Sequence, residues 1–202
     1  MRGPLDKLIK QLSALPGLGP RSARRLAIHL LTNRENIMKP LSDTLSETAD
    51  QITACHICGN LDTNDPCQIC SDSHRDNSAL CIVAHVADLW AIERTHSYYG
   101  QYHVLGGLLS ALDGRGPDEL GIPGLINRIV EHDYDEVILA LNATVDGQST
   151  AHYISDQLKE YDIRLSRLSH GLPMGGELDY LDDGTISLAL SARSKLSSAG
   201  SG

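Results

Sequence analysis

The chain contains no phenylalanine and few aromatic residues of any kind, with one tryptophan and seven tyrosines making up 4% of its 202 residues. Its core must therefore be built mainly from leucine, isoleucine, valine and alanine. No apolar run is long enough to cross a bilayer. No N-terminal signal peptide is visible, because the first residues lead directly into an amphipathic pattern. These absences argue against a membrane protein and predict a cytoplasmic location with no membrane partner.

Positive charge is scarce in the chain as a whole but is concentrated at one end. The formal net charge is −9, which by itself argues against a general nucleic-acid binder. Residues 1–40 nevertheless hold eight basic side chains against two acidic ones, a net charge of +6, so the rest of the chain carries −15. This division predicts two partners of opposite sign: phosphate for the basic end, and a basic protein surface for the acidic remainder.

Four of the five cysteines form the most informative pattern in the chain. Two Cys-x2-Cys pairs, Cys55 with Cys58 and Cys67 with Cys70, have eight residues between them. Each pair presents two thiolates to one point in space. Four thiolates satisfy tetrahedral zinc and leave no coordination position open, which is typical of structural sites. Gly59 can adopt the positive φ that such a turn requires. The pattern predicts one structural Zn²⁺ per chain.

Two disulfides are the alternative for these four cysteines. We disfavour them because nothing else in the chain indicates an oxidising compartment. His56 could compete as a ligand, but with four thiolates present we expect it to face solvent. The fifth cysteine, Cys81, lies in an apolar run, and we expect it to be a buried small hydrophobic residue.

The N-terminal residues predict two helices joined by a glycine hairpin. Leucine, isoleucine and alanine recur at helical spacing over residues 5–15 and again over 23–30. The run 16–20 breaks the period. We expect Gly19 to be the N-cap of the second helix and Pro20 its first residue, where a missing N–H costs nothing. A third helix is predicted over about 41–53.

This hairpin is suited to bind phosphate. Gly17 and Gly19 have no side chains, so backbone N–H groups can approach an anion, and the second helix directs its positive end to the same place. Arg21, Arg24 and Arg25 fall off the apolar stripe and add charge beside it. The segment 15–23 resembles the helix-hairpin-helix motif, which grips the DNA backbone without reading sequence. The alternative is a plain helical hairpin with a solvated basic face.

After residue 76 the pattern alternates between strands and helices, which predicts an α/β fold. The alternation favours a mostly parallel sheet with flanking helices, whose functional loops lie at the carboxyl ends of the strands. The predicted strands are 80–84, 102–105, 136–141 and 164–168. The predicted helices between them are 88–94, 122–131 and 147–159. In the C-terminal segment we expect a rigid loop over 171–176, a strand over 178–181, a helix over 185–193 and disorder over 197–202.

The run 139–151 resembles the Toprim domain of topoisomerases, primases and recombination mediators. Catalytic Toprim domains hold Mg²⁺ with a glutamate after the first strand and an Asp-x-Asp after a later one, because hard cations prefer oxygen ligands. Here Ala84 stands at the first position, and Asn142 and Thr144 stand at the other two. Asp146 remains nearby as a charge at the start of a helix. The resemblance therefore implies a Toprim-like fold with an inert site and no catalytic residue.

Taken together, nearly the whole chain resembles the RecR family of bacterial recombination mediators. The strings that carry the resemblance are 15–23, the cysteine element 55–70, 102–110, 114–117 and 171–176. The chain departs from the usual family pattern at 84–86, where Ala-His-Val replaces Glu-Glu-Pro, and at 146–148, where Asp-Gly-Gln replaces Glu-Gly-Glu. Both departures reduce negative charge near a surface that could bind partners.

The resemblance implies a non-catalytic, DNA-binding mediator of recombinational repair. Such proteins act with RecO and RecF at gapped or tailed DNA and help RecA replace single-strand-binding protein. They form homodimers and ring-shaped homotetramers on single- or double-stranded DNA. In such a ring Arg21, Arg24 and Arg25 would face the DNA, and the acidic Toprim-like body would receive RecO. Asn142 and Asp146 are the candidate partner contacts.

The expected organisation has four segments. They are a helix-hairpin-helix region over 1–53 for DNA binding and oligomerisation, a four-cysteine zinc finger over 54–76, a Toprim-like domain over 77–172 and a small C-terminal oligomerisation segment over 173–202. A metal-dependent Toprim nuclease or topoisomerase-like enzyme is the chief alternative, and Ala84, Asn142 and Thr144 argue against it. A zinc-dependent transcription regulator is a third possibility, but the hairpin glycines favour backbone contact over base reading.

Overall fold

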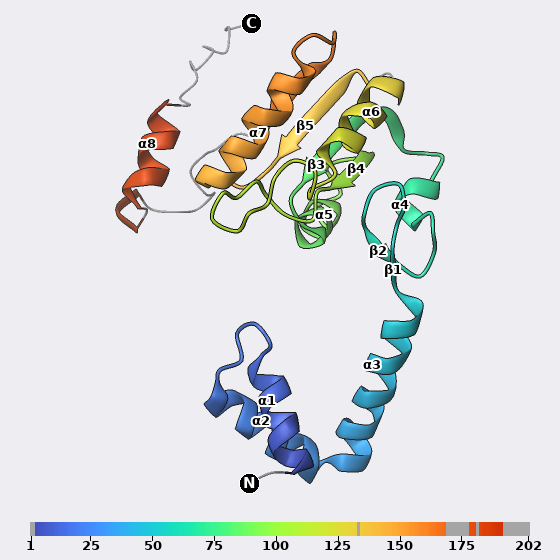
Figure 1. Ribbon diagram of the computed structural model, residues 1–202, viewed down its shortest axis with the longest axis vertical. Coiled ribbons are helices and arrows are strands. Elements are labelled where there is room, and N and C mark those ends of the chain that lie inside the picture. Colours follow the sequence, from blue (N-terminus) through green and yellow to red (C-terminus); the bar gives the residue numbers. More distant parts are fainter. Residues whose placement is uncertain (1–2, 133, 169–177, 181, 192–202) are drawn as a thin grey trace, which may run out of the picture. The chain divides into compact units, whose positions relative to one another are not determined.

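The computed structural model describes residues 3–132, 134–168, 178–180 and 182–191. The chain divides into two compact units, residues 1–52 and 53–202, and each is described by itself (Figure 1). The predictions for 171–176 and 197–202 lie outside the described residues.

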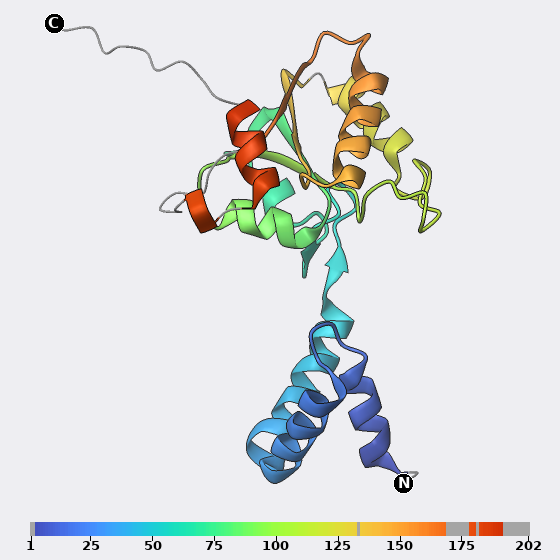
Figure 2. The same ribbon diagram turned by 90° about the vertical axis from the view of Figure 1, so that its left-hand side faces the viewer.

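The first unit is helical, as the spacing of its apolar residues predicts. Its elements are α1 (Pro4–Ser13), α2 (Pro20–Thr32), a π-helical turn (Arg34–Met38) and α3 (Lys39–Gln51). Helices α1 and α2 lie side by side, joined by the loop 14–19 (Figure 2). Gly19 is the N-cap of α2 and Pro20 its first residue, which confirms the expected start. Ala23, Ala27 and Leu30 form its buried stripe.

Helix α3 begins two residues earlier than predicted and ends at Gln51 rather than at residue 53. Pro40 is tolerated because it occupies the first turn, where no intrahelical N–H bond is lost. The helix stops because Ile52 adopts an extended conformation, with φ −86° and ψ 127°. The next two residues enter a strand, β1 (Thr53–Ala54).

The second unit begins with a small antiparallel ribbon. Strand β1 pairs with β2 (Leu61–Asp62), and the short helix α4 (Gln68–Ser71) follows. Periodicity in the sequence did not reveal these elements, because strands of two residues are too short to show an alternation of apolar and polar side chains.

A four-stranded parallel sheet forms the centre of this unit. Its strands are β3 (Asp76–Val83), β4 (Gly100–Val104), β5 (Glu136–Ala140) and β6 (Arg164–Arg167), in the order β4-β3-β5-β6. The connecting helices are α5 (Val86–Glu93), α6 (Ile122–His132) and α7 (Val145–Leu158). The predicted α/β class and parallel sheet are confirmed.

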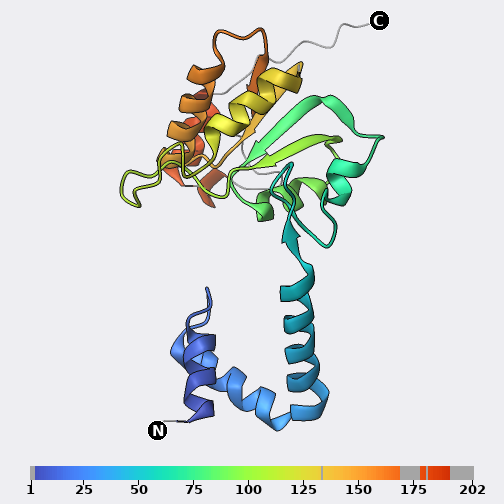
Figure 3. The same ribbon diagram turned by 45° about the vertical axis from the view of Figure 1, so that its right-hand side comes forward.

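Helices cover both faces of this sheet, because alternate residues of β3 point in opposite directions. Leu80 and Ile82 pack with the apolar faces of α6 and α7, which lie side by side (Figure 3). Cys81 and Val83 pack on the other face, in the cluster that contains Leu89 of α5. Both clusters are aliphatic apart from tyrosine and Cys81, as the absence of phenylalanine requires.

Some element boundaries differ from the prediction, and one element is of another type. Strand β3 starts at Asp76, four residues early, and α5 starts at Val86 because the Asp88 carboxylate accepts the backbone N–H of His85 at 2.9 Å. The strand predicted over 178–181 is wrong, since Leu178–Tyr180 forms a 3-10 turn. Helix α8 (Asp183–Ser191) begins two residues before the predicted start.

Candidate metal centre and nucleic-acid interface

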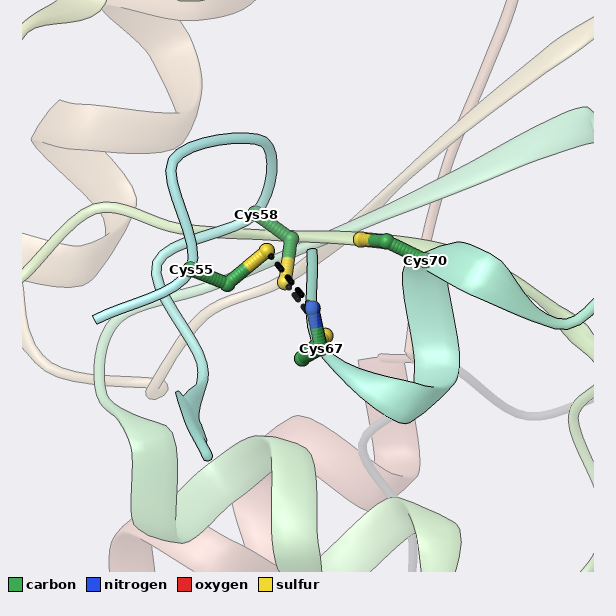
Figure 4. A group of neighbouring side chains, drawn as sticks. All are labelled: Cys55, Cys58, Cys67 and Cys70. Atoms are coloured by element: carbon green, nitrogen blue, oxygen red, sulfur yellow. Dashed lines mark hydrogen bonds between the residues drawn. The ribbon is translucent and has the colours of Figure 1, made fainter. Parts of the chain in front are cut away.

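The four cysteines of the two Cys-x2-Cys pairs converge on one point. Their sulfur atoms lie within 4.8 Å of one another, and Figure 4 shows them directed toward a common centre. Four sulfurs at about 2.3 Å from a tetrahedral zinc ion stand about 3.8 Å apart, so the cluster fits a single ion. The chain carries these cysteines as free thiols, not as disulfides.

Backbone hydrogen bonds shape the first cysteine turn. Gly59 has φ +77°, as predicted, and its N–H donates to the Cys55 carbonyl at 2.8 Å. The N–H of Cys55 donates to the Asn60 carbonyl at 2.7 Å. The N–H of Asn60 is 3.4 Å from the Cys58 sulfur, and that of Cys67 is 3.4 Å from the Cys55 sulfur. Such N–H donors stabilise thiolates, which are the form that binds zinc.

The pKa values of two of the cysteine thiols are also shifted by their neighbours in the cluster. The neighbouring Cys70 side chain, aided by the Asn60 N–H, lowers the pKa of Cys58 to about 5. The neighbouring Cys58 side chain, together with burial, raises the pKa of Cys70. Zinc binds cysteine as the thiolate, so binding of the ion to this cluster would release the remaining thiol protons.

His56 and Cys81 also have the exposure that the sequence predicts. His56 is exposed, and its Nδ1 lies 2.7 Å from an Asp65 carboxylate oxygen rather than pointing into the cysteine cluster. Cys81 is only 2% exposed. Burial raises the pKa of its thiol to about 12.

The N-terminal hairpin presents both glycines and arginines to solvent. Gly17 has φ +78°, and no atom lies within 4 Å of a Cβ built at Gly17 or Gly19. The loop is closed by the Leu18 N–H, which donates to the Leu15 carbonyl at 3.1 Å. The side chains that follow on the exposed face of α2 are Arg21, Arg24 and Arg25.

The carboxyl edge of the sheet brings the Toprim-like positions together. Strands β3 and β5 pair in parallel with Val83 opposite Ala140, so Ala84 and Asn142 follow neighbouring strands at the same edge. Ala84 is fully buried. Thr144 is the N-cap of α7, and its hydroxyl accepts the Gly147 N–H at 3.1 Å.

Among the described residues, the four cysteines are the only group of three or more histidine, cysteine or acidic side chains whose ligand atoms converge. The described part of the sheet edge has no such cluster. Asp146 lies in the first turn of α7 and is exposed, as is Asn142. Beside them, a pocket of about 650 Å³ opens between α7 and β6 and includes Gln148, His152 and Arg167 in its lining.

Comparison with known proteins assigns these regions to families. The model described as "RecR, helix-hairpin-helix" matches residues 5–49, and the RecR four-cysteine zinc finger model matches 52–72. The Toprim domain model matches 78–169, and "RecR, C-terminal" matches 171–194. Recombination protein RecR of Bartonella bacilliformis is 54% identical over 192 residues, covering 95% of this chain and 96% of that protein.

Recombination protein RecR of Brucella anthropi is also 54% identical, over 195 residues that cover 96% of this chain and 97% of its own. The chain belongs to the RecR family. Its four-cysteine centre is therefore a structural zinc site, formed by Cys55, Cys58, Cys67 and Cys70. Membership is consistent with a role in DNA recombination and repair, and the helix-hairpin-helix region supports DNA binding.

In this RecR-family chain, sequence reasoning missed the contacts that attach the finger to the sheet. Arg128 of α6 donates to the Ile57 carbonyl at 2.9 Å. The N–H of Val104 in β4 donates to the Cys58 carbonyl at 2.8 Å. Trp90, the only tryptophan, donates its indole N–H to the Asn60 side chain at 3.0 Å. Nothing in the local sequence pattern signals these contacts.

The part of the chain that the structure describes has no helix both long and apolar enough to cross a membrane.

Proposed function

We propose that this chain is a non-catalytic mediator of recombinational repair, which binds single- or double-stranded DNA and acts with RecO and RecF to help load RecA at gaps. The observation that carries the proposal is the exposed glycine hairpin with its arginines, on a chain whose remainder is strongly acidic. Family membership supports the same conclusion. The protein would work in the cytoplasm, where the DNA is.

The DNA contact would be made by Gly17, Gly19, Arg21, Arg24 and Arg25. The two glycines leave the hairpin backbone open to a phosphate, and the first N–H groups of α2 lack intrahelical partners. The arginines supply charge on the same helix. Contacts of this kind neutralise phosphates without reading bases, so binding would be independent of sequence and sensitive to salt.

Partner contact would involve Asn142 and Asp146 at the carboxyl edge of the sheet. Both are exposed beside the pocket between α7 and β6. The exposed Asp146 carboxylate, on a chain that carries a net charge of −15 outside residues 1–40, suits a basic partner such as we propose for RecO. The low density of carboxylates at this edge also supports a non-catalytic role, because Mg²⁺ needs several oxygen ligands.

The four segments 1–53, 54–76, 77–172 and 173–202 would divide these tasks, with the first and last also joining copies into homodimers and homotetramers. Leu41 and Leu45 on α3 are 43% and 62% exposed. Such an apolar stripe is suited to contact a second copy of the chain.

RecA loading on gapped DNA tests the proposed function directly. Gapped DNA coated with single-strand-binding protein is mixed with RecA, and filament growth is followed with RecO and RecF, with and without this protein. We expect filament growth to accelerate when the protein is present. An Asp146→Arg variant should lose part of the acceleration, whereas Asp162→Arg, which reverses an exposed charge in the α7–β6 loop, should not. No acceleration by the parent protein would refute the proposal.

Reversing charge on α2 tests the DNA surface. We expect the double variant Arg24→Glu, Arg25→Glu to bind DNA more weakly and to lower the slope of log affinity against log salt by about 2, one for each lost phosphate contact. The measurement is fluorescence anisotropy over a salt series. As a control, Arg164→Glu with Arg167→Glu reverses two exposed arginines of β6 and should leave the slope unchanged. If the affinity and the slope are unaltered in the α2 variant, the DNA-binding surface does not lie on this helix.

A plasmid assay separates this proposal from the nuclease or topoisomerase-like alternative. Supercoiled plasmid is incubated with the purified protein and Mg²⁺, and we expect the DNA to stay supercoiled. Nicking or relaxation that disappears in an Asp146→Ala variant would establish an enzyme and overturn the non-catalytic role.

A further inference from the structure

Arg128 joins the sheet to the zinc finger through its guanidinium. Its side chain comes from α6, and one terminal nitrogen donates to the Ile57 carbonyl at 2.9 Å and to the Tyr102 carbonyl at 3.1 Å. The other donates to the Gln101 side chain at 3.1 Å. Ile57 is 71 residues away in sequence. A planar group with five N–H donors can reach a finger carbonyl and two groups of β4 together, which a lysine ammonium cannot do in the same geometry.

The carbonyl that Arg128 contacts belongs to the first metal-binding turn. Ile57 lies between the ligands Cys55 and Cys58, and the next carbonyl, that of Cys58, accepts the Val104 N–H of β4 at 2.8 Å. Two successive peptide groups of this turn are therefore bonded to the rest of the unit, one to Arg128 of α6 and one to β4. Because peptide groups are planar and both of these flank the Cα of Cys58, the bonds restrict the direction in which the Cys58 Cα–Cβ bond, and hence its sulfur, can point.

The second cysteine turn has a different kind of backbone support. The Gln68 N–H donates to an Asp62 carboxylate oxygen at 2.8 Å, and the Ser71 N–H donates to the Cys67 carbonyl at 3.0 Å. Both acceptors lie inside the finger. The backbone bonds of the second turn named here stay within the finger, whereas those of the first turn extend to α6 and β4 as well.

We propose that Arg128 is a positioning residue for the zinc site, which holds the Cys55–Cys58 turn in its metal-binding conformation before the ion arrives. The metal then needs to order less of the chain, and release of the metal requires this turn to move against its bonds to Arg128 and to β4. Outer-shell partners of metal ligands change metal affinity by about 10- to 100-fold when they are removed, and we place Arg128 in that group.

Arg75 provides a matched control for a role in general stability. Its side chain is also partly buried, it donates to a β4 carbonyl, that of Gly100, at 2.9 Å, and it pairs with Glu93. Its Nε, like that of Arg128, is buried and has no hydrogen-bond partner among the described residues. Removal of either arginine should destabilise the sheet, but only Arg128 bonds to the Cys55–Cys58 turn.

The test measures zinc release from the full-length zinc-loaded protein. Arg128→Met and Arg75→Met are mixed with excess of a colorimetric chelator, and the rate of zinc transfer is compared with that of the parent. We expect release from Arg128→Met to be at least about tenfold faster, and release from Arg75→Met to stay within about twofold of the parent while its melting temperature falls. Equal acceleration in both variants, or none in Arg128→Met, would overturn the proposal.

Cobalt substitution adds a readout that a merely structural role would not change. The visible bands of a Co²⁺–thiolate centre report ligand geometry, so we expect altered bands and weaker Co²⁺ binding in Arg128→Met and parent-like bands in Arg75→Met. If Arg128→Met does not fold, Arg128→Lys is used instead, because lysine keeps the positive charge but lacks the planar set of N–H donors. We expect the same altered bands, weaker Co²⁺ binding and faster zinc release in this variant. Parent-like bands and release in a folded Arg128→Lys would then defeat the proposal.

Discussion

His103 illustrates how one side chain can make folding depend on pH. It lies in β4 next to Arg128, with its Nδ1 3.3 Å from the guanidinium. Burial, and to a smaller extent the positive charge of Arg128, lower the pKa of His103 from 6.5 to about 4. The folded protein therefore keeps this imidazole neutral at a pH where the unfolded chain already binds a proton.

We expect this histidine to contribute to acid destabilisation. Its contribution to stability is fully present above pH 6.5 and is lost as the pH falls toward 4, up to an upper limit of about 3 kcal/mol. Urea unfolding of the parent and of His103→Gln at pH 7 and pH 4.5 measures the effect. The variant should lose less stability between the two pH values. The same loss in both proteins would show that His103 does not titrate in this way.

Single residues of this chain were predictable where chemistry depends on residue type and spacing. The four zinc ligands, the positive φ of Gly59 and the burial of Cys81 all followed from the sequence. The lowered pKa of His103 did not, because it arises from burial and from an arginine 25 residues further along that only the folded chain brings near.

Helix α7 begins in a tightly packed turn around a glycine. A Cβ built on Gly147 would lie 2.0 Å from the Asn142 carbonyl oxygen and 3.3 Å from the Thr144 hydroxyl. The loop after β5 therefore needs glycine here in order to turn tightly into the helix. In α6, by contrast, no atom lies within 4 Å of a Cβ built on Gly124.

These two helical glycines should respond to alanine in opposite directions. We expect Gly147→Ala to destabilise the protein by about 1–3 kcal/mol, because the Asn142 loop must move away. Gly124→Ala should stabilise it by up to about 1 kcal/mol, since alanine is the better helix former and nothing obstructs it. Chemical denaturation of both variants tests the pair. A Gly147→Ala protein as stable as the parent would contradict the tight turn.

Elements with several turns or a long apolar run were predicted correctly, with boundaries displaced by a few residues. The runs around β3 and β5 are examples, since buried strands are apolar throughout. The ribbon of β1 and β2 was missed because a strand of two residues is too short to show an alternation of apolar and polar side chains. The supposed strand at 178–181 failed because apolar residues in so short a run fit a 3-10 turn equally well.

At the scale of the whole molecule, all four zinc ligands belong to the unit 53–202, and the basic hairpin belongs to the unit 1–52. The finger is bonded to β4, α5 and α6 of its own unit. Structural zinc contributes directly to folding free energy. Loss of the ion should therefore loosen the finger and the sheet residues that contact it.

Hydrogen exchange can locate this response. After zinc is removed by a chelator, we expect faster exchange at the Cys55 and Val104 amides, whose hydrogen bonds hold the first cysteine turn. The Ala23 amide, bonded to the Gly19 carbonyl at the start of α2, should keep its protection. Mass spectrometry of the parent with and without chelator makes the comparison. Equal loss of protection in α2 would mean that the two units unfold together.

By itself the sequence determined the features that depend on neighbours along the chain. These are the four-cysteine zinc site within residues 55–70, the glycine hairpin with its arginines, the parallel α/β class and the missing carboxylates at 84, 142 and 144. Local spacing is sufficient for the cysteine pairs, the hairpin and the alternation of strands and helices, whereas the resemblance to Toprim domains identified positions 84, 142 and 144.

The tertiary structure alone decided the strand order β4-β3-β5-β6 and the attachment of the finger through Arg128 and Trp90. Each of these depends on which apolar faces pack together once the chain has folded back on itself. Packing of this kind is set by the joint burial of residues far apart in sequence, and it leaves no period or spacing that could be read along the chain.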